Sequence, residues 1–224
     1  MEGAVTDPRV HEGPPTGEPT MEPAVAVIEL ASIAVGIEAG DAMVKRAPVD
    51  VVRAGTIHPG KYVVLVSGAV ADVEEAFEAG TAVGESCLVD TVLLPNVHPA
   101  VVRALRGGRR AGGGEALGVV ETATIAAIVE AADAGLKGAA VELLELRLGD
   151  GIGGKGYLLF DGAVSDVEAA VDIALARVAD GLAGAVPGGR APVGRVIAQL
   201  HREMRTELEA DARFGRRVGR DAEA

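Results

Sequence analysis

Short apolar runs alternate along the chain with segments of helical periodicity. After an apolar run at residues 24–30, Ile33, Ile37 and Val44 recur near one face at helical spacing. Ser32 stands before this segment, where its hydroxyl can accept an amide of the first helical turn. The helix is expected to end before Pro48, because the residue before proline avoids α geometry.

The pattern then predicts more strands and a second helix. Two strands are expected around residues 49–54 and 61–67, with a glycine-rich loop between them. A second helix is expected from near Asp72, and a last strand includes residues 88–94. The resulting order is β-α-β-β-α-β.

The same pattern occurs twice. VIELASIAVGIEAGDAMVKRAPV begins at Val27, and VVETATIAAIVEAADAGLKGAAV begins at Val119. GKYVVLVSGAVADVE from Gly60 likewise matches GKGYLLFDGAVSDVE from Gly154. The chain is therefore a tandem duplication. The matched pairs include Glu29 with Glu121, Ser32 with Thr124, Asp41 with Asp133, and Lys45 with Lys137.

The predicted fold class is α+β, with two tandem domains that each place helices on one side of an antiparallel sheet. We expect the domains to span residues 24–104 and 116–194. Residues 1–23 are rich in Pro, Gly and Glu and predict a disordered tail. Residues 105–115 predict a flexible linker, and residues 195–224 a helical extension and tail.

Composition narrows the possible functions. The net charge of −12 argues against nucleic acid as a partner, because phosphate binding needs a concentrated basic surface. The single cysteine cannot form an internal disulfide, which is typical of a cytoplasmic protein. No apolar run is long enough to predict a membrane span, and the N-terminus does not resemble a signal peptide.

The repeated segments resemble the bacterial microcompartment shell domain. The likeness is carried by AVIELASIAVGIEAGDAMVKRAPVDVV and LGVVETATIAAIVEAADAGLKGAAVELL, and by the two loop-strand-helix segments that follow them. Two such domains in tandem resemble the trimeric type of shell protein. This resemblance implies a structural tile: a homotrimer with a pseudo-hexagonal outline and a central pore for metabolites.

The same resemblance implies partners and location. The tile would sit in a microcompartment shell in the cytoplasm, beside hexameric and pentameric tiles, and encapsulated enzymes are possible partners. The loop between the second and third strands would point to the threefold axis. The implied pore-lining residues are Ile57, His58, Pro59 and Gly60 in the first copy and Gly151, Ile152, Gly153 and Gly154 in the second.

His58 has two readings. In propanediol-utilisation members of the family a cysteine occupies this position, and three such cysteines hold an iron–sulfur cluster on the axis. Here the residue is histidine, and the only cysteine, Cys87, lies elsewhere, so a thiolate-held cluster is not expected. Three imidazoles could bind a metal, which would make the protein a metal-binding or electron-transfer tile. The simpler reading is a pH-sensitive polar collar without a metal or other cofactor.

The resemblance also implies residues at the tile edge. Lys45 and Lys137 occupy the position at which the family's lysine packs against a neighbouring tile. LPNVHP partly matches the family's edge motif, with Asn96 where arginine is common. In the second copy the weaker match VPGGRAP suggests Arg190. Either lysine could instead be a solvated helix-end residue.

Two other classes of protein, an enzyme and a small-molecule sensor, are alternatives to a shell tile. A catalytic protein is not expected, because the sequence offers no hydrolase elbow and no paired carboxylates in a distinctive loop. GDGIGGKG lacks the hydroxyl residue that a Walker A motif requires after its lysine. A trimeric small-molecule sensor built from ferredoxin-like domains is the second alternative; it would stay a discrete trimer rather than form layers.

Overall fold

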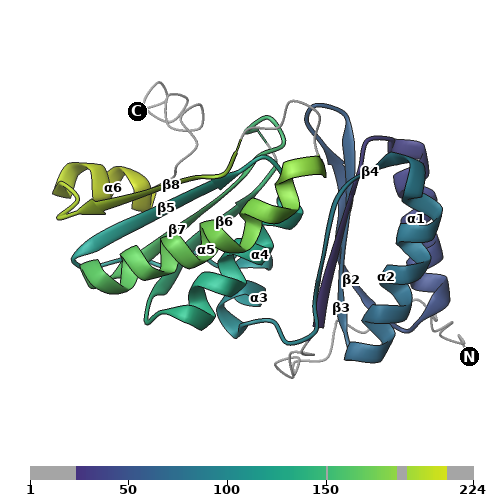
Figure 1. Cartoon of the computed structure of the whole chain (residues 1–224), viewed down its shortest axis with the longest axis horizontal. Coiled ribbons are helices and arrows are strands. Elements are labelled where there is room, and N and C mark those ends of the chain that lie inside the picture. The colour runs from purple at the N-terminus through teal and green to yellow at the C-terminus, as the bar shows by residue number, and fades with distance from the viewer. Residues whose placement is uncertain (1–23, 150, 186–190, 211–224) are drawn as a thin grey trace, which may run out of the picture.

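The computed structural model describes residues 24–149, 151–185 and 191–210, and shows two similar domains side by side (Figure 1). Each domain contains a four-stranded antiparallel sheet with two helices packed on one face. The predicted α+β class and the β-α-β-β-α-β order in each copy are confirmed. The tail predicted for residues 1–23 lies outside the described residues.

The first domain has strand order β2-β3-β1-β4. β1 lies between β3 and β4, so both of its edges are paired and all of its residues are buried. The elements are β1 (Ala24–Leu30), α1 (Ile33–Arg46), β2 (Asp50–Ile57), β3 (Lys61–Gly68), α2 (Val70–Gly84), a 3-10 turn η1 (Glu85–Cys87), β4 (Leu88–Leu94) and α3 (Pro99–Leu105).

The second domain repeats this order as β6-β7-β5-β8. Its elements are β5 (Ala116–Thr122), α4 (Ile125–Gly138), β6 (Glu142–Leu148), β7 (Gly156–Gly162), α5 (Val164–Ala185), β8 (Val193–Ala198) and α6 (Arg202–Ala210).

The predicted caps of the first helix in each copy are confirmed. The hydroxyl of Ser32 accepts the amide of Val35 at 3.4 Å, and the hydroxyl of Thr124 accepts the amide of Ala127 at 3.3 Å. α1 ends at Arg46, before Pro48, as expected.

The prediction of a helix from residue 195 is wrong. Residues 193–198 form β8, which pairs antiparallel with β5 and completes the second sheet; the helix α6 begins only at Arg202. Gly194 lies against the side chains of Val171 and Leu175 of α5, where a Cβ would collide, so glycine at this position lets β8 pack closely against α5. The helix α3 after β4 was not predicted, and α6 is its counterpart after β8.

The linker is anchored rather than flexible. The amide of Arg110 donates to the carbonyl of Leu144 on the edge of β6, at 3.0 Å. The amides of Gly113 and Gly114 donate to one carboxylate oxygen of Asp161, at 3.0 and 2.6 Å. Because these partners lie in other parts of the chain, glycine-rich composition alone gave the wrong expectation.

The two domains meet in an apolar contact that we call the interdomain seam: the face of the first sheet opposite α1 and α2, covered by α4, against which α3 packs (Figure 1). Val25, Val27 and Leu65 of the sheet belong to one buried cluster with residues of α3 and α4. As a result α4 is buried on two sides, against its own sheet and against the first domain, whereas α1 buries only Gly36, Ala39 and Met43.

No helix among the described residues is both long enough and apolar enough to span a membrane.

Candidate functional site

The loop between β2 and β3 is a tight turn that exposes His58. The amide of Gly60 donates to the carbonyl of Ile57 at 2.9 Å, and Gly60 has φ 94°. A positive φ favours glycine, because it brings a Cβ into conflict with the backbone. His58, Pro59 and Gly60 are exposed, and Ile57 is half-buried.

The loop between β6 and β7 contains four glycines in the left-handed conformation. Gly149, Gly151, Gly153 and Gly154 have φ between 60° and 76°. The amide of Gly149 donates to the carbonyl of Lys155 at 2.9 Å, and the amide of Gly154 donates to the carbonyl of Gly149 at 3.2 Å. The chain can therefore turn back within a few residues.

The structure brings these two loops into contact. A Cβ placed on Gly154 would overlap the carbonyl oxygen of His58, and one on Gly149 would lie 3.0 Å from the side chain of Ile57. The two loops that the sequence suggests as pore-lining therefore lie side by side at the junction of the two domains, with Gly154 buried in the contact.

A buried carboxylate crosses the interdomain seam beside these loops. Glu29 on β1 is 0 % exposed; one oxygen binds the ammonium of Lys61, whose side chain is 15 % exposed. Its other oxygen accepts the amide of Ile125 in the first turn of α4, at 2.8 Å. That amide has no acceptor within its own helix, so Glu29 satisfies it from the other domain.

Asp90 on β4 is a second acceptor for the same helix end. It lies opposite Glu29 in the sheet register and accepts the hydroxyl of Thr124, the N-cap of α4. Its other oxygen accepts the amide of Thr91 at 2.8 Å. Two carboxyl groups of the first domain therefore hold the N-terminus of α4.

Burial raises the pKa of both carboxyl groups. For Glu29 the loss of water outweighs the opposing effect of the Lys61 ammonium and the Ile125 amide on its pKa. For Asp90 the loss of water likewise raises the pKa against its hydrogen bonds from Thr124 and Thr91.

The second domain contains the same ion pair in an open position. Lys155 binds Glu121 at 2.7 Å, and the side chains are 40 % and 45 % exposed. The sequence showed both residues as repeats of Lys61 and Glu29, but their pairing was missed. The signal was available, since glutamate and lysine recur together in both copies.

Two of the suggested tile-edge residues lie together. The ammonium of Lys137 donates to the carbonyl of Asn96 and to Asp133, the latter at 2.6 Å. Asp133 also accepts the amide of His98 at 2.7 Å, so α4 contacts the segment after β4 at two points.

The corresponding lysine of the first copy makes no such contact. Lys45 is exposed and binds only Asp41 among the described residues, at 2.5 Å. Arg190 lies outside the described residues.

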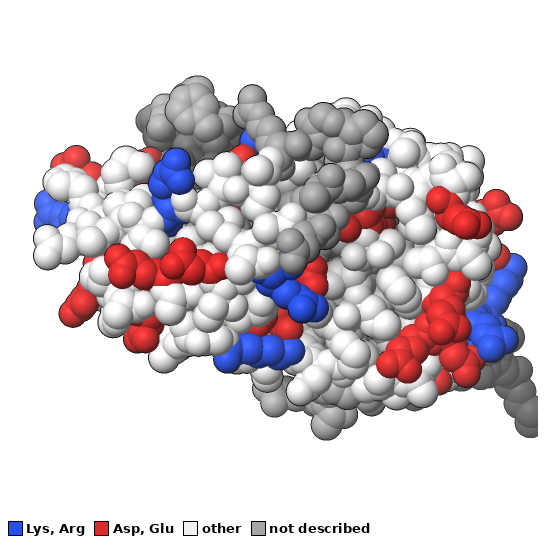
Figure 2. Space-filling view, in the orientation of Figure 1, with Lys and Arg blue, Asp and Glu red and all other residues white. Residues whose placement is uncertain are grey.

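Charge on the surface is mixed. On the face drawn in Figure 2, acidic side chains cover parts of both domains, and lysines and arginines form small groups beside them. Several basic residues of the described chain pair with acids, for example Arg46 with Glu75 at 3.1 Å and Arg177 with Glu130 at 2.8 Å.

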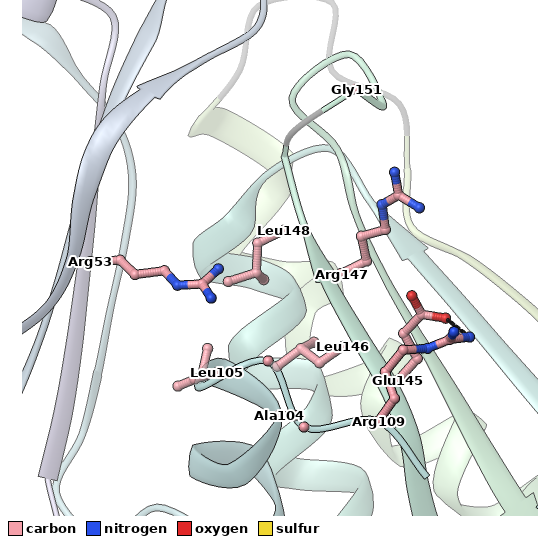
Figure 3. Close-up of a pocket in the computed structure, with 11 residues that line it drawn as sticks. Arg53, Ala104, Leu105, Arg109, Glu145, Leu146, Arg147, Leu148 and Gly151 are labelled. Carbon is pink, nitrogen blue, oxygen red and sulfur yellow. Dashed lines mark hydrogen bonds and ion pairs between the residues drawn. The ribbon is translucent and has the colours of Figure 1, made fainter. Parts of the chain in front are cut away.

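A cleft of about 580 Å³ opens between the edge strands β2 and β6. Arg53 reaches in from β2, whereas Arg147 and the Arg109–Glu145 ion pair lie on the other side (Figure 3). The guanidinium groups do not converge on one point, and Arg109 already binds a carboxylate at 2.9 Å. The cleft therefore lacks the convergent polar groups typical of a catalytic site.

Within residues 24–149, 151–185 and 191–210 of one chain, no three His, Cys, Asp or Glu side chains are placed to hold a metal ion. Cys87, half-buried at the end of η1, lies outside both glycine-containing loops.

Comparison with known families gives the same duplication. The model of the BMC domain matches twice, at residues 24–97 and 116–186. The chain belongs to the BMC-domain family. Its two BMC domains make it a shell protein of the tandem type, so the resemblance predicted from the sequence is confirmed.

Individual relatives support this assignment. The chain is 42% identical over 154 residues to the bacterial microcompartment shell protein PduT of Citrobacter freundii, covering 69% of this chain and 84% of the relative. A microcompartment protein from Desulfitobacterium hafniense is 36% identical with a TM-score of 0.71, covering 83% of this chain and 99% of that one. The fused permuted hexameric shell protein MSM0275 shares the fold, with a TM-score of 0.52 and 20% identity over 71% of this chain and 83% of its own.

The contact between the two BMC loops leads to a first prediction. Gly154→Ala should destabilise the protein more than Gly153→Ala, because both have positive φ but only Gly154 faces the His58 carbonyl. Left-handed strain alone costs about 1–2 kcal/mol, and displacing a backbone group adds about 1–3 kcal/mol. Denaturant unfolding of both variants measures the difference, and equal losses would show that the loops do not touch.

The raised pKa of Asp90 leads to a second prediction. Because the folded state holds this proton more tightly than the unfolded state, the stability that Asp90 contributes should increase as the pH falls through the raised pKa, and decrease as it rises. Asp90→Asn keeps an acceptor but cannot titrate. The difference in unfolding free energy between the wild type and the variant should therefore shift in favour of the wild type as the pH is lowered from neutral toward the ordinary aspartate pKa, about 4. A constant difference, or one that moves the other way, contradicts the prediction.

Proposed function

We propose that this shell protein is a non-catalytic tile in which three copies form a ring around a pore lined by the two glycine-containing loops. The observation that carries the proposal is the interdomain seam. It covers the open face of the first sheet with α4 of the second domain, whose counterpart in the first domain is the uncovered helix α1.

The apolar surface of α1 supports the ring. Ile33, Ile37 and Val44 are 40 %, 55 % and 40 % exposed. Their counterparts on α4, Ile125, Val129 and Leu136, are buried. We expect α1 to pack on the second domain of another copy as α4 packs on the first domain of its own chain. Such a contact joins two different surfaces, so repeating it from copy to copy can close a ring.

The position of the loops supports the pore. Both loops lie at the junction of the domains, with His58 exposed and in contact with Gly154. Three copies would alternate a histidine loop with a glycine loop around the axis. Imidazole changes its charge between pH 5 and pH 8, so the ring would be a pH-sensitive polar collar that passes anions more readily as the pH falls.

The other readings have less support. A metal-binding tile would need His58 from several copies, because the described part of one chain brings no three His, Cys, Asp or Glu side chains together to hold a metal ion. An electron-transfer tile with a thiolate-held cluster lacks a cysteine in either loop. A sensor would need a formed effector pocket, and the arginines of the 580 Å³ cleft do not converge.

The edge residues extend the proposal to the shell. Lys45 and the Lys137–Asn96 pair would lie where tiles meet, so that the ring packs beside other shell tiles around encapsulated enzymes. Lys137 remains 42 % exposed while it binds Asn96 across the domain contact, so Lys45 can make an equivalent contact within the ring and still face a neighbouring tile.

The ring predicts a homotrimer that depends on α1. Ile37→Asp should convert the trimer to monomers, because a carboxylate buried without a partner costs several kcal/mol per contact, and about 3 kcal/mol lowers affinity more than 100-fold. Sedimentation velocity at micromolar concentration measures the change. Val83→Asp, at an exposed apolar site on α2, is the matched control and should remain trimeric. A wild-type protein that sediments as a monomer would refute the ring.

The pore predicts a separate phenotype for His58→Ala. The variant should remain folded and trimeric, because His58 is an exposed loop residue. In planar bilayers or reconstituted shells, the wild type should conduct small anions better at pH 6 than at pH 7.5, and the variant should lose this difference. Zinc retained stoichiometrically by the wild type but not by the variant would favour the metal-binding tile instead.

A further inference from the structure

The ion pairs Glu29–Lys61 and Glu121–Lys155 occupy equivalent positions in the two domains, but the first is buried and the second is exposed. The first is enclosed by the interdomain seam, and Glu29 has a second partner, the amide of Ile125. The second lies open to solvent, and Lys155 is the bonding partner that the structure gives to Glu121. The duplicated chain therefore shows what an enclosed copy of the Glu121 site looks like.

The group that would enclose Glu121 is present on α1. Ser32 caps α1 as Thr124 caps α4, and the amide of Ile33 occupies the position of the Ile125 amide. First-turn amides have no acceptor inside their own helix. The side chain of Ile33 is exposed, whereas that of Ile125 is buried in the seam.

The two sites differ at one position of the sheet. Glu29 lies opposite Asp90, which accepts the Thr124 hydroxyl. Glu121 lies opposite Val193 in the same register of β5 and β8. The second site thus keeps the acceptor for the helix amide but lacks the acceptor for the capping hydroxyl.

We propose that Glu121 accepts the Ile33 amide of a second copy, and that Val193 leaves the Ser32 hydroxyl of that copy without a carboxylate. The contact between copies is then held by one carboxylate where the contact within the chain is held by two. This proposal rests on the ring of the proposed function. It implies that the contact between copies dissociates more readily than the contact between the two domains of one chain.

A second pair of contacts fixes the same register. Within the chain, Asp133 accepts the amide of His98, and Lys137 donates to the carbonyl of Asn96. The positions that correspond after β8 are His201 and Gln199. His98 and His201 have the same local role: each accepts through Nδ1 the amide two residues later, at 3.2 and 3.4 Å.

The partners for those positions also lie on α1. Asp41 and Lys45 form an exposed ion pair that corresponds to Asp133 and Lys137. Docking of α1 with Ile33 on Glu121 would bring Asp41 toward the amide of His201 and Lys45 toward the carbonyl of Gln199. The helix would then be held at both ends, as α4 is.

The missing carboxylate provides a gain-of-function test. Val193→Asp should slow subunit exchange about tenfold at pH 7.5, since a hydrogen bond to a charged acceptor is among the stronger ones. Exchange between isotopically labelled and unlabelled protein is followed by native mass spectrometry. Ser32→Ala should abolish the gain, and the coupling in the double-mutant cycle should be close to tenfold. Val193→Leu is the control and should leave exchange unchanged.

A loss-of-function variant tests Glu121 itself. Glu121→Ala should accelerate exchange about tenfold, whereas Glu142→Ala, which removes the exposed ion pair of Glu142 with Arg110, should not. If neither Val193→Asp nor Glu121→Ala alters exchange while Ile37→Asp still dissociates the trimer, the contact assigned to Glu121 is wrong and the ring stands. If the wild type is a monomer, both are wrong.

Discussion

The arrangement of the two domains depends on the fully buried carboxylate of Glu29. One oxygen binds a lysine of its own domain, and the other accepts a backbone amide of the second domain. A charge taken out of water costs several kcal/mol unless it is paired and hydrogen-bonded. These two contacts therefore fix together the pairing of β1 with β3 and the position of α4, and the apolar residues of the seam pack around them.

Identical residues have different energetic roles in the two copies. The Glu121–Lys155 pair is solvated, and an ion pair of this kind stabilises a protein by at most about 1 kcal/mol. The Glu29–Lys61 pair has lost its water and cannot be broken without leaving a buried charge. The chemistry is the same in both places; the difference is made by a helix that covers one pair and not the other.

Much of the fold could be predicted because the sequence contains two copies of the same domain. Helical spacing, the capping hydroxyls and Pro48 defined α1, and the repeat transferred that definition to α4. Periodicity could not predict that α4 has a second buried face, because its alanines suit solvent and protein contacts alike. The strand β8 was missed for a related reason: Arg195 and the charged residues after it have the composition of a helix, and only pairing with β5 makes 193–198 a strand. The contact of Gly154 with His58 joins residues that no local pattern connects.

The anchored linker bears on how a ring could be assembled. With Gly113 and Gly114 held by Asp161, the second domain is delivered to the first at short range, so their contact forms as a unimolecular step with an effective concentration of order millimolar or higher. Only the contacts between chains then depend on protein concentration, and these are half of the domain contacts in the ring. Covalent linkage also removes the requirement for sixfold identity, so one loop can carry an imidazole while its neighbour is rich in glycine.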